Sequence, residues 1–188
     1  MAVSIRPATA EDASAIARVR IDSWRATYRG IVPDAYLDSM DVEASTELWD
    51  RVLSADSSSA SVFVAEDDGR IVGFAAGNML KEPRHELNAE LTAIYLRPDY
   101  QHAGIGRRLV ERVARAERAH GANGLIVWVM SGNKRARAFY EGLGATLLIE
   151  QPFEWDGVPL LETGYGFRDL DSLIDACARD GEDPGSMH

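Results

Sequence analysis

The run Leu125–Met130 is apolar at every position, and it restricts the possible folds more than any other segment. A short apolar run bounded by glycine and polar residues is typical of a strand buried within a sheet. Helical patterns precede and follow it, at 104–120 and 134–141, and both end at glycines. A buried strand between two helices predicts a sheet with helices packed against it.

The remaining patterns extend this sheet in both directions. The turn residues Asp67-Asp68-Gly69 and Asp156-Gly157 each join two β-type runs and predict hairpins. A polar loop is expected between 78 and 89, and the serine-rich stretch 54–59 is expected to be another. The further strands are predicted at 3–6, 61–66, 70–78, 89–96, 145–150 and 159–166, and the further helices at 10–28, after Pro33, at 43–53 and at 170–179. The predicted fold class is therefore α/β (α+β), a mixed sheet covered by helices.

Length and composition are those of a folded protein of one domain. The chain has 188 residues, of which 46% are hydrophobic. It contains no internal repeat and no low-complexity linker, so we expect a single domain over 1–180 and a flexible tail over 181–188.

Charge and cysteine content exclude several classes of function. The formal net charge of −10 disfavours non-specific binding to nucleic acid, which needs a basic surface. The lone Cys177 excludes an intrachain disulfide and any multi-cysteine metal site, and the four scattered histidines have no metal-ligand spacing, so we expect no metal. Without a leader-like or long apolar segment, the expected location is the cytoplasm, with no membrane partner.

A glycine-containing loop between the strand at 89–96 and the next helix is the first motif that indicates chemistry. Gly104 and Gly106 stand where the helix begins, and its first amide hydrogens have no partner within the helix. Free amides, the helix dipole and the charges of Arg107 and Arg108 suit a bound phosphate. The dinucleotide fingerprint fails because Leu109 replaces its third glycine, and the Gly-Lys-Ser/Thr ending of the nucleoside-triphosphate loop is absent. Alone, a Gly-x-Gly is equally typical of a structural turn.

A second motif follows the buried strand and makes the first one specific. Asn133 and Tyr140 lie seven residues apart, on nearly one face of the helix predicted at 134–141. Together, the two motifs resemble the GNAT family of acetyl-coenzyme A-dependent N-acetyltransferases. The residues that carry the resemblance are Gln101, Gly104 and Gly106 in the loop, and Asn133, Ala136, Phe139, Tyr140 and Gly144 in the helix.

The resemblance implies a fold, a co-substrate and roles for matched residues. It implies a mostly antiparallel sheet of about seven strands that splays between the fourth and fifth, with acetyl-coenzyme A in the gap. The pyrophosphate is expected on the main chain of Gln101, His102, Ala103, Gly104, Ile105, Gly106 and Arg107. Ile94 and Leu96 are expected to contact the pantetheine arm and thioester, with Asn133 bonding to the pantetheine. Homodimers are common among relatives.

Acid–base chemistry assigns further roles. The thiolate that leaves needs a proton, which the phenol of Tyr140 can give, although Tyr140 can also be read as a core aromatic beside Phe139. The amide of Leu96 is a candidate oxyanion donor. The leading candidate for the base is Glu90, which strict alternation places on one strand face with Thr92, Ile94 and Leu96. A solvated carboxylate at the strand end is the equal alternative for Glu90.

Other groups are weaker candidates for the base. Some relatives place a glutamate on the next strand, five residues before the asparagine, where this chain has Trp128. Glu86 and His85 precede the strand at 89–96 and can act through a water molecule. Cys177 lies away from both motifs, so we expect no acyl-enzyme on it.

The acceptor side is less specified by the sequence. The resemblance implies that Trp24 and Tyr28 wall the acceptor pocket, whereas their helical spacing fits core packing equally well. Glu154, Trp155 and Asp156 form a second cluster able to receive an amine cation. The acceptor remains open among a polyamine, an aminoglycoside-like drug, an amino acid and a protein N-terminus. The alternatives to an acetyltransferase are a non-catalytic acyl-coenzyme A sensor and, less favoured, a dinucleotide oxidoreductase.

Overall fold

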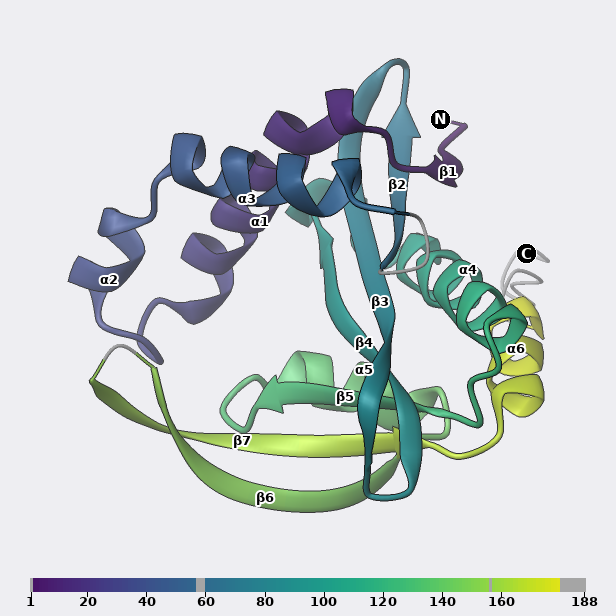
Figure 1. The fold of residues 1–188 in the computed structure, drawn as a ribbon. Helices are drawn as coiled ribbons and strands as arrows, with labels where there is room; N and C mark the ends of the chain where they lie inside the picture. The colour runs from purple at the N-terminus through teal and green to yellow at the C-terminus, as the bar shows by residue number, and fades with distance from the viewer. Residues whose placement is uncertain (1, 57–59, 156, 180–188) are drawn as a thin grey trace, which may run out of the picture.

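The computed structural model describes residues 2–56, 60–155 and 157–179, which form one sheet flanked by helices (Figure 1). The strand order is β1-β2-β3-β4-β5-β7-β6, and every pair of neighbours is antiparallel except β4 and β5, which are parallel. The strands are β1 (Ser4–Pro7), β2 (Ser61–Asp67), β3 (Arg70–Arg84), β4 (Leu87–Leu96), β5 (Leu125–Met130), β6 (Thr146–Trp155) and β7 (Val158–Phe167). The predicted mixed, mostly antiparallel sheet is confirmed. The tail predicted at 181–188 and the turn residue Asp156 lie outside the described residues.

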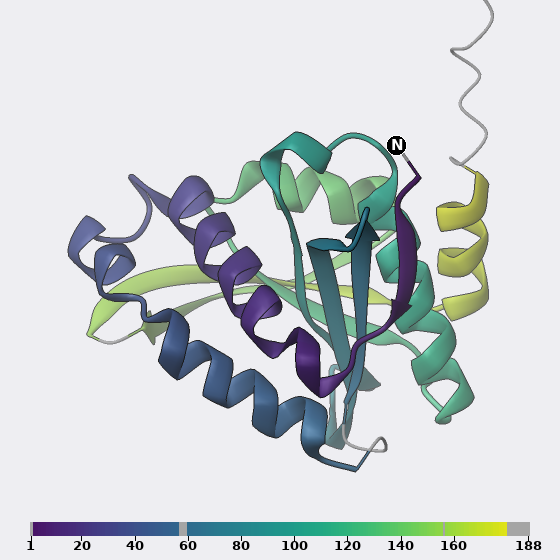
Figure 2. The same cartoon turned by 90° about the horizontal axis from the view of Figure 1, so that it is seen from above.

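Helices cover the two faces of the sheet. They are α1 (Ala13–Tyr28), α2 (Asp34–Ser39), α3 (Val42–Ser54), α4 (Ile105–Ala119), α5 (Lys134–Gly142) and α6 (Leu170–Arg179), with short 3₁₀ turns at Ala10–Asp12 and Pro98–Tyr100. Figure 2 shows α1 beside α3 on one side of β2 and β3, and α4 beside α6 on the other. The α4 side buries Leu109 and Val113, as their spacing predicts, whereas the α1 side buries Ile16 and Phe74.

The splay between β4 and β5 positions the site. The two strands pair only at Glu90 with Ile126 and at Leu91 with Val127. Beyond these pairs β4 continues to Leu96 and β5 to Met130, and Figure 1 shows β5 turning away from the direction of β4. The strands therefore part along the rest of their length, which leaves main-chain groups on both free to bind something between them.

The hairpin between β3 and β4 is longer than the sequence predicts. The prediction of a polar loop between 78 and 89 was wrong, because β3 continues to Arg84 and β4 begins at Leu87. His85 and Glu86 make the turn with positive φ angles of 49° and 70°. Residues 81–86 are all exposed, so the hairpin extends beyond the core and has no apolar alternation that would identify it as strand.

A bulge in β4 changes the face on which Glu90 lies. Ala76 pairs with Ala93 and the next residue, Gly77, pairs with Leu91, so Thr92 is an extra residue, and its hydroxyl donates to the Ala76 carbonyl at 3.1 Å. The α4-side core takes Leu91 before the bulge but Ile94 and Leu96 after it. The expectation that Glu90 shares a face with Ile94 and Leu96 was therefore wrong, because one inserted residue reverses the alternation.

Candidate active site

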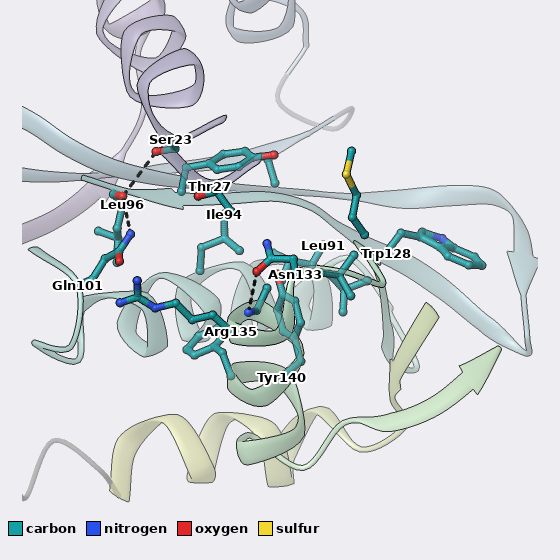
Figure 3. Close-up of a pocket in the computed structure, with 18 of the residues that line it drawn as sticks. Ser23, Thr27, Leu91, Ile94, Leu96, Gln101, Trp128, Asn133, Arg135 and Tyr140 are labelled. Atoms are coloured by element: carbon teal, nitrogen blue, oxygen red, sulfur yellow. Dashed lines mark hydrogen bonds between the residues drawn. The ribbon is translucent and has the colours of Figure 1, made fainter. Parts of the chain in front are cut away.

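A cavity of about 1360 Å³ occupies the opening between β4 and β5. Its walls come from α1 and α3, from β4 and the loop that leads into α4, from β5, from α5 and α6, and from β6 and β7. Figure 3 shows three parts of it: Leu96, Gln101 and Arg135 at one end, Asn133 and Tyr140 in the middle, and Trp128 at the other end. The two motifs of the sequence therefore meet in one cavity.

The loop end of the cavity is built from main chain and cations. Gly104 is the N-terminal cap of α4 and has a φ of 74°, a conformation that glycine adopts without strain. A Cβ at Gly106 would lie 3.4 Å from the Phe139 ring, in van der Waals contact, so a side chain larger than alanine would meet this ring. Arg107 and Arg135 line the cavity there, and Arg135 donates to His102 Nε2. Amides and cations thus gather where a diphosphate is expected.

Most residues predicted to bind the co-substrate line this cavity. They are Ile94, Leu96, Gln101, His102, Ala103, Gly104, Gly106, Arg107 and Asn133. Ile105 does not: its side chain is 3% exposed and belongs to the α4-side core, which leaves only its main chain for a ligand. Arg108 also lines the cavity, but both of its terminal nitrogens donate to the Val3 carbonyl at 3.1 Å, so it also anchors the N-terminal segment.

Hydrogen bonds fix the middle of the cavity. Gln101 Nε2 donates to the Leu96 carbonyl at 3.2 Å, which holds the loop against the end of β4. Asn133 caps α5, because its Oδ1 accepts from the Ala136 amide at 3.1 Å, and its Nδ2 donates to the Tyr28 hydroxyl at 3.3 Å. Figure 3 shows Asn133 and Tyr140 on the same side of the cavity. Asn133 therefore joins α5 to α1 across the opening.

Tyr140 is both a core residue and a cavity residue. Its side chain is 5% exposed and packs with the α4-side core, while the same residue lines the cavity. Burial raises the pKa of Tyr140 well above its ordinary value, and Tyr95 and Tyr28 raise it further. The sequence left open whether Tyr140 is a proton donor or a core aromatic residue, and the structure is compatible with both. A phenol with so high a pKa remains protonated, so it can supply a proton but cannot serve as the base.

The carboxylates near the cavity are Glu90 and Glu162. Glu90 is half-buried and is not among the lining residues, whereas Glu162 of β7 lines the cavity and accepts from Gln151 Nε2 at 2.8 Å. Burial raises the pKa of Glu90; Arg84 opposes this rise and Glu162 adds to it. A carboxylate with a raised pKa is a stronger proton acceptor than an ordinary glutamate.

The other candidates for the base lie outside the cavity. His85 and Glu86 form the exposed turn of the β3–β4 hairpin, and Glu86 pairs with Arg168 at 3.4 Å. His85 approaches the ring of Trp128 at 6.4 Å between centroids. Trp128 lines the cavity, and its ring fills the space above Gly164, where a Cβ would lie 2.8 Å from Trp128 Cζ3.

Aromatic side chains wall the far part of the cavity. Trp24 and Tyr28 are both nearly buried and line it, so the core and pocket readings both apply to them. The Trp24 ring lies 4.6 Å from that of Tyr28 and 5.5 Å from that of Trp155, and Trp24 Nε1 donates to the Tyr95 hydroxyl at 2.9 Å. From the cluster predicted at the last hairpin, Trp155 lines the cavity and Glu154 does not.

Sequence reasoning missed several cavity residues: Arg20, Trp49, Tyr95, Arg135, Glu162 and Cys177. The expectation that Cys177 lies away from both motifs was wrong, because α6 packs beside α4 and brings this residue to the cavity. Arg20 could have been found, because it stands one helical turn before Trp24 on the same face of α1. Tyr95 could not, because the bulge at Thr92 sets its direction. Trp49 and Glu162 come from elements that no motif connects to the site.

Metal ligands and membrane-spanning helices are both absent from residues 2–56, 60–155 and 157–179. Within this part of the chain, no group of three or more histidine, cysteine, aspartate or glutamate side chains is placed to hold a metal ion. No helix in the same part is long and apolar enough to cross a membrane.

Comparison with known proteins gives a consistent result. The family model described as "Acetyltransferase (GNAT) family" matches residues 21–145. The N-acetyltransferase YuaI of Bacillus subtilis is 36% identical over 91% of this chain and 96% of its own length. The spermidine N(1)-acetyltransferase of Thermoplasma acidophilum is 27% identical over 74% of this chain and 86% of its own length.

Solved structures agree on the fold. The PaiA N-acetyltransferase of Thermoplasma acidophilum in complex with coenzyme A superposes with a TM-score of 0.67, 23% identity and coverage of 89% of this chain and 100% of that one. YncA of Salmonella typhimurium with acetyl-CoA gives 0.66, 21% identity and coverage of 89% and 94%. With the splayed sheet, the amide-rich loop and the Asn133–Tyr140 helix in place, the chain belongs to the GNAT family and is an acetyl-coenzyme A-dependent N-acetyltransferase.

Proposed function

We propose that the enzyme acetylates the primary amine of a small molecule or peptide by direct attack, with acceptor and acetyl-coenzyme A bound together. The observation that carries this proposal is the single cavity, in which an amide- and arginine-lined end and an aromatic end meet at Tyr140. One end suits a diphosphate and the other suits an organic amine. When bound, acetyl-coenzyme A supplies an acetyl group activated as a thioester.

The residues of the loop and of β4 hold the co-substrate in this proposal. The amides from Gln101 to Arg107 bind the diphosphate, and Arg107 and Arg135 neutralise its charge. Ile94, Leu96 and Asn133 bind the pantetheine arm in the gap between the strands, which orients the thioester toward Tyr140. The Leu96 amide donates to the thioester oxygen as negative charge develops there.

Proton transfers complete the reaction. The acceptor ammonium loses a proton to Glu90, through a water molecule because Glu90 lies outside the cavity wall, and its raised pKa suits this role. The carbon–nitrogen bond then forms and the carbon–sulfur bond breaks. Tyr140 gives its proton to the departing sulfur, since burial keeps the phenol protonated. The amide product cannot keep the second nitrogen proton, which passes through water to the Tyr140 oxygen, while Glu90 releases the first proton to solvent. The phenol and the carboxylate are thereby restored.

Thiol release tests the proposal. The protein is mixed with acetyl-coenzyme A and a panel of amines that includes polyamines, aminoglycosides, amino acids and peptides, and free thiol and acetylated product are measured together. We expect thiol release only when an acceptor is present, with acetyl found on the amine and none on the protein. Binding of acetyl-coenzyme A without thiol release for any amine would support the sensor alternative, and acetylated protein would contradict direct attack.

A further inference from the structure

Arg20 is a cation on the acceptor side of the cavity whose charge no described carboxylate balances. It stands one turn before Trp24 on α1, lines the cavity and places its guanidinium carbon 5.2 Å from the centroid of the Trp24 ring. No carboxylate in the described part of the chain forms an ion pair with it, unlike the neighbouring Arg29, which pairs with Asp34 and Asp38. A half-buried guanidinium without an anion is costly unless a ligand supplies one.

A second donor that lacks a described acceptor also lines the cavity. Trp49 of α3 is 9% exposed and also lines the cavity, and its Nε1 is buried with no hydrogen-bond acceptor among the described residues. Its ring meets that of Phe74 at 5.1 Å, and Phe74 meets Tyr95 at 5.6 Å, which places it on the α1 side of β4. An indole N–H and a guanidinium offer donors only, so a ligand that binds both must present an acceptor-only group such as a carboxylate.

Arg20 is connected to the middle of the cavity through Trp24, whose ring lies 4.6 Å from that of Tyr28 and whose Nε1 donates to the Tyr95 hydroxyl. The positive charge of Arg20 lowers the pKa of both Tyr28 and Tyr95, and the same two phenols raise the pKa of Tyr140. Arg20 and Tyr140 therefore both interact electrostatically with Tyr28 and Tyr95. The charged groups that act on Glu90 are instead Arg84 and Glu162. The acceptor side thus has a positive group at α1 and carboxylates at β4 and β7.

We propose that the acceptor is an amine that carries a carboxylate close to the reacting nitrogen, such as a free α-amino acid, and that Arg20 and Trp49 bind this carboxylate. The inference rests on the proposed function and adds to it the substrate class. A zwitterion matches this distribution of charge. Its carboxylate reaches Arg20, while its ammonium faces the carboxylates of β4 and β7, one of which removes its proton. A polyamine would leave Arg20 unpaired and bring a second cation toward it.

Product pairs that differ only in the carboxylate test this inference without turnover. Calorimetry with the coenzyme A-loaded protein compares N-acetyl-L-phenylalanine with N-acetylphenethylamine, N-acetyl-L-methionine with N-acetyl-3-(methylthio)propylamine, and N-acetyl-L-lysine with N-acetylcadaverine. We expect the carboxylate member of at least one pair to bind about 10- to 100-fold more tightly, the range for charge-assisted hydrogen bonds. N-acetyl dipeptides are measured as well, because tight binding of these would identify the acceptor as a peptide rather than a free amino acid.

Variants assign the preference to the proposed residues. The preference is the ratio of the two affinities within a product pair. Arg20→Gln should reduce this ratio to nearly one, Arg20→Lys should keep part of it, and Trp49→Phe should lower it several-fold. Arg18→Gln is the matched control, because Arg18 is exposed on the same helix, and it should leave the preference unchanged. Unchanged coenzyme A affinity shows that each variant is folded.

The outcomes separate this inference from the proposed function. Equal affinity within every pair, no binding of any carboxylate product, or a preference that survives Arg20→Gln would each overturn the carboxylate site. Thiol release with amines that lack a carboxylate would, in those cases, leave the acetyltransferase proposal standing. Absence of thiol release with every amine would contradict the proposed function, whatever the products bind.

Discussion

The two ends of the cavity are constructed differently. The loop end uses main-chain amides and arginines from two continuous segments, 96–107 and 133–140, each of which runs from a strand into a helix. The acceptor end uses side chains from α1, α3, β6 and β7, which are far apart in the sequence. A site made from main chain tolerates changes of residue type, whereas a site made from side chains changes with each substitution. We therefore expect the loop end to be recognisable across the family and the acceptor end to set the choice of acceptor.

Tyr140, where the two ends meet, should give the largest effect. Tyr140→Phe removes the proton donor but keeps the ring in its core position, so we expect kcat to fall about 100-fold or more while coenzyme A affinity changes little. Steady-state kinetics and calorimetry measure the two quantities. Tyr100→Phe is the control, because the Tyr100 hydroxyl donates to Asp67 outside the cavity. Equal losses of turnover and affinity would mean that Tyr140 only shapes the cavity.

Glu90 should give the next largest effect and a change in pH dependence. Because Glu90 must be deprotonated to accept a proton, kcat/KM should rise with pH through a pKa above the ordinary value of 4.5 for glutamate. Glu90→Gln should abolish this limb and lower kcat/KM about 10- to 100-fold near neutral pH. The control is Glu82→Gln, at an exposed position of the same hairpin. The same acidic limb in Glu90→Gln would show that another group is the base.

Gly106 tests the loop end separately. Gly106→Val places methyl groups against Phe139 and Leu96, which lie only 3.4 Å and 3.6 Å from the point that a Cβ would occupy, so the start of α4 must move. We expect coenzyme A affinity to fall about 10-fold, because a small displacement of several amides weakens each of their bonds. Gly142→Val serves as the control, since a Cβ there meets nothing within 4 Å. Unchanged affinity in Gly106→Val would place the diphosphate elsewhere.

Trp24 tests the acceptor end with the smallest change. Trp24→Phe keeps an aromatic face but loses the hydrogen bond to the Tyr95 hydroxyl. The phenyl ring also attracts an amine cation less strongly than the indole, by about 1 kcal/mol, so the acceptor KM should rise roughly five-fold while coenzyme A affinity stays constant. Initial-rate kinetics with each substrate varied in turn measure both. An equal rise in the KM for acetyl-coenzyme A would contradict the division of the cavity into two ends.

The sequence predicts the fold and the loop end better than the acceptor end, for a physical reason. Gly104, Gly106, Asn133 and Tyr140 stand within short segments, and their spacing is read directly from local geometry. The bulge at Thr92 depends on pairing between β3 and β4, which the sequence of β4 alone does not show. For this reason the sequence could predict neither the direction of Tyr95 nor the face of β4 on which Glu90 lies.

The acceptor end depends on long-range packing. Trp49 and Glu162 reach the cavity only because α3 lies beside α1 and because β7 pairs with β5. Arg20 is the exception, because its place on the face of α1 that bears Trp24 is local information. The proposal of a carboxylate site depends on the observation that Arg20 forms no ion pair with any described carboxylate. This observation comes from the folded structure and not from the sequence.

Hydrogen exchange with and without coenzyme A tests the central claim most directly, namely that the co-substrate binds where β4 and β5 part. We predict that coenzyme A slows exchange in three segments, 92–96 of β4, 101–107 of the loop and 128–130 of β5. Exchange in α2, none of whose residues lines the cavity, should be unchanged. Slowing confined to other segments, or none with coenzyme A at saturating concentration, would contradict the account.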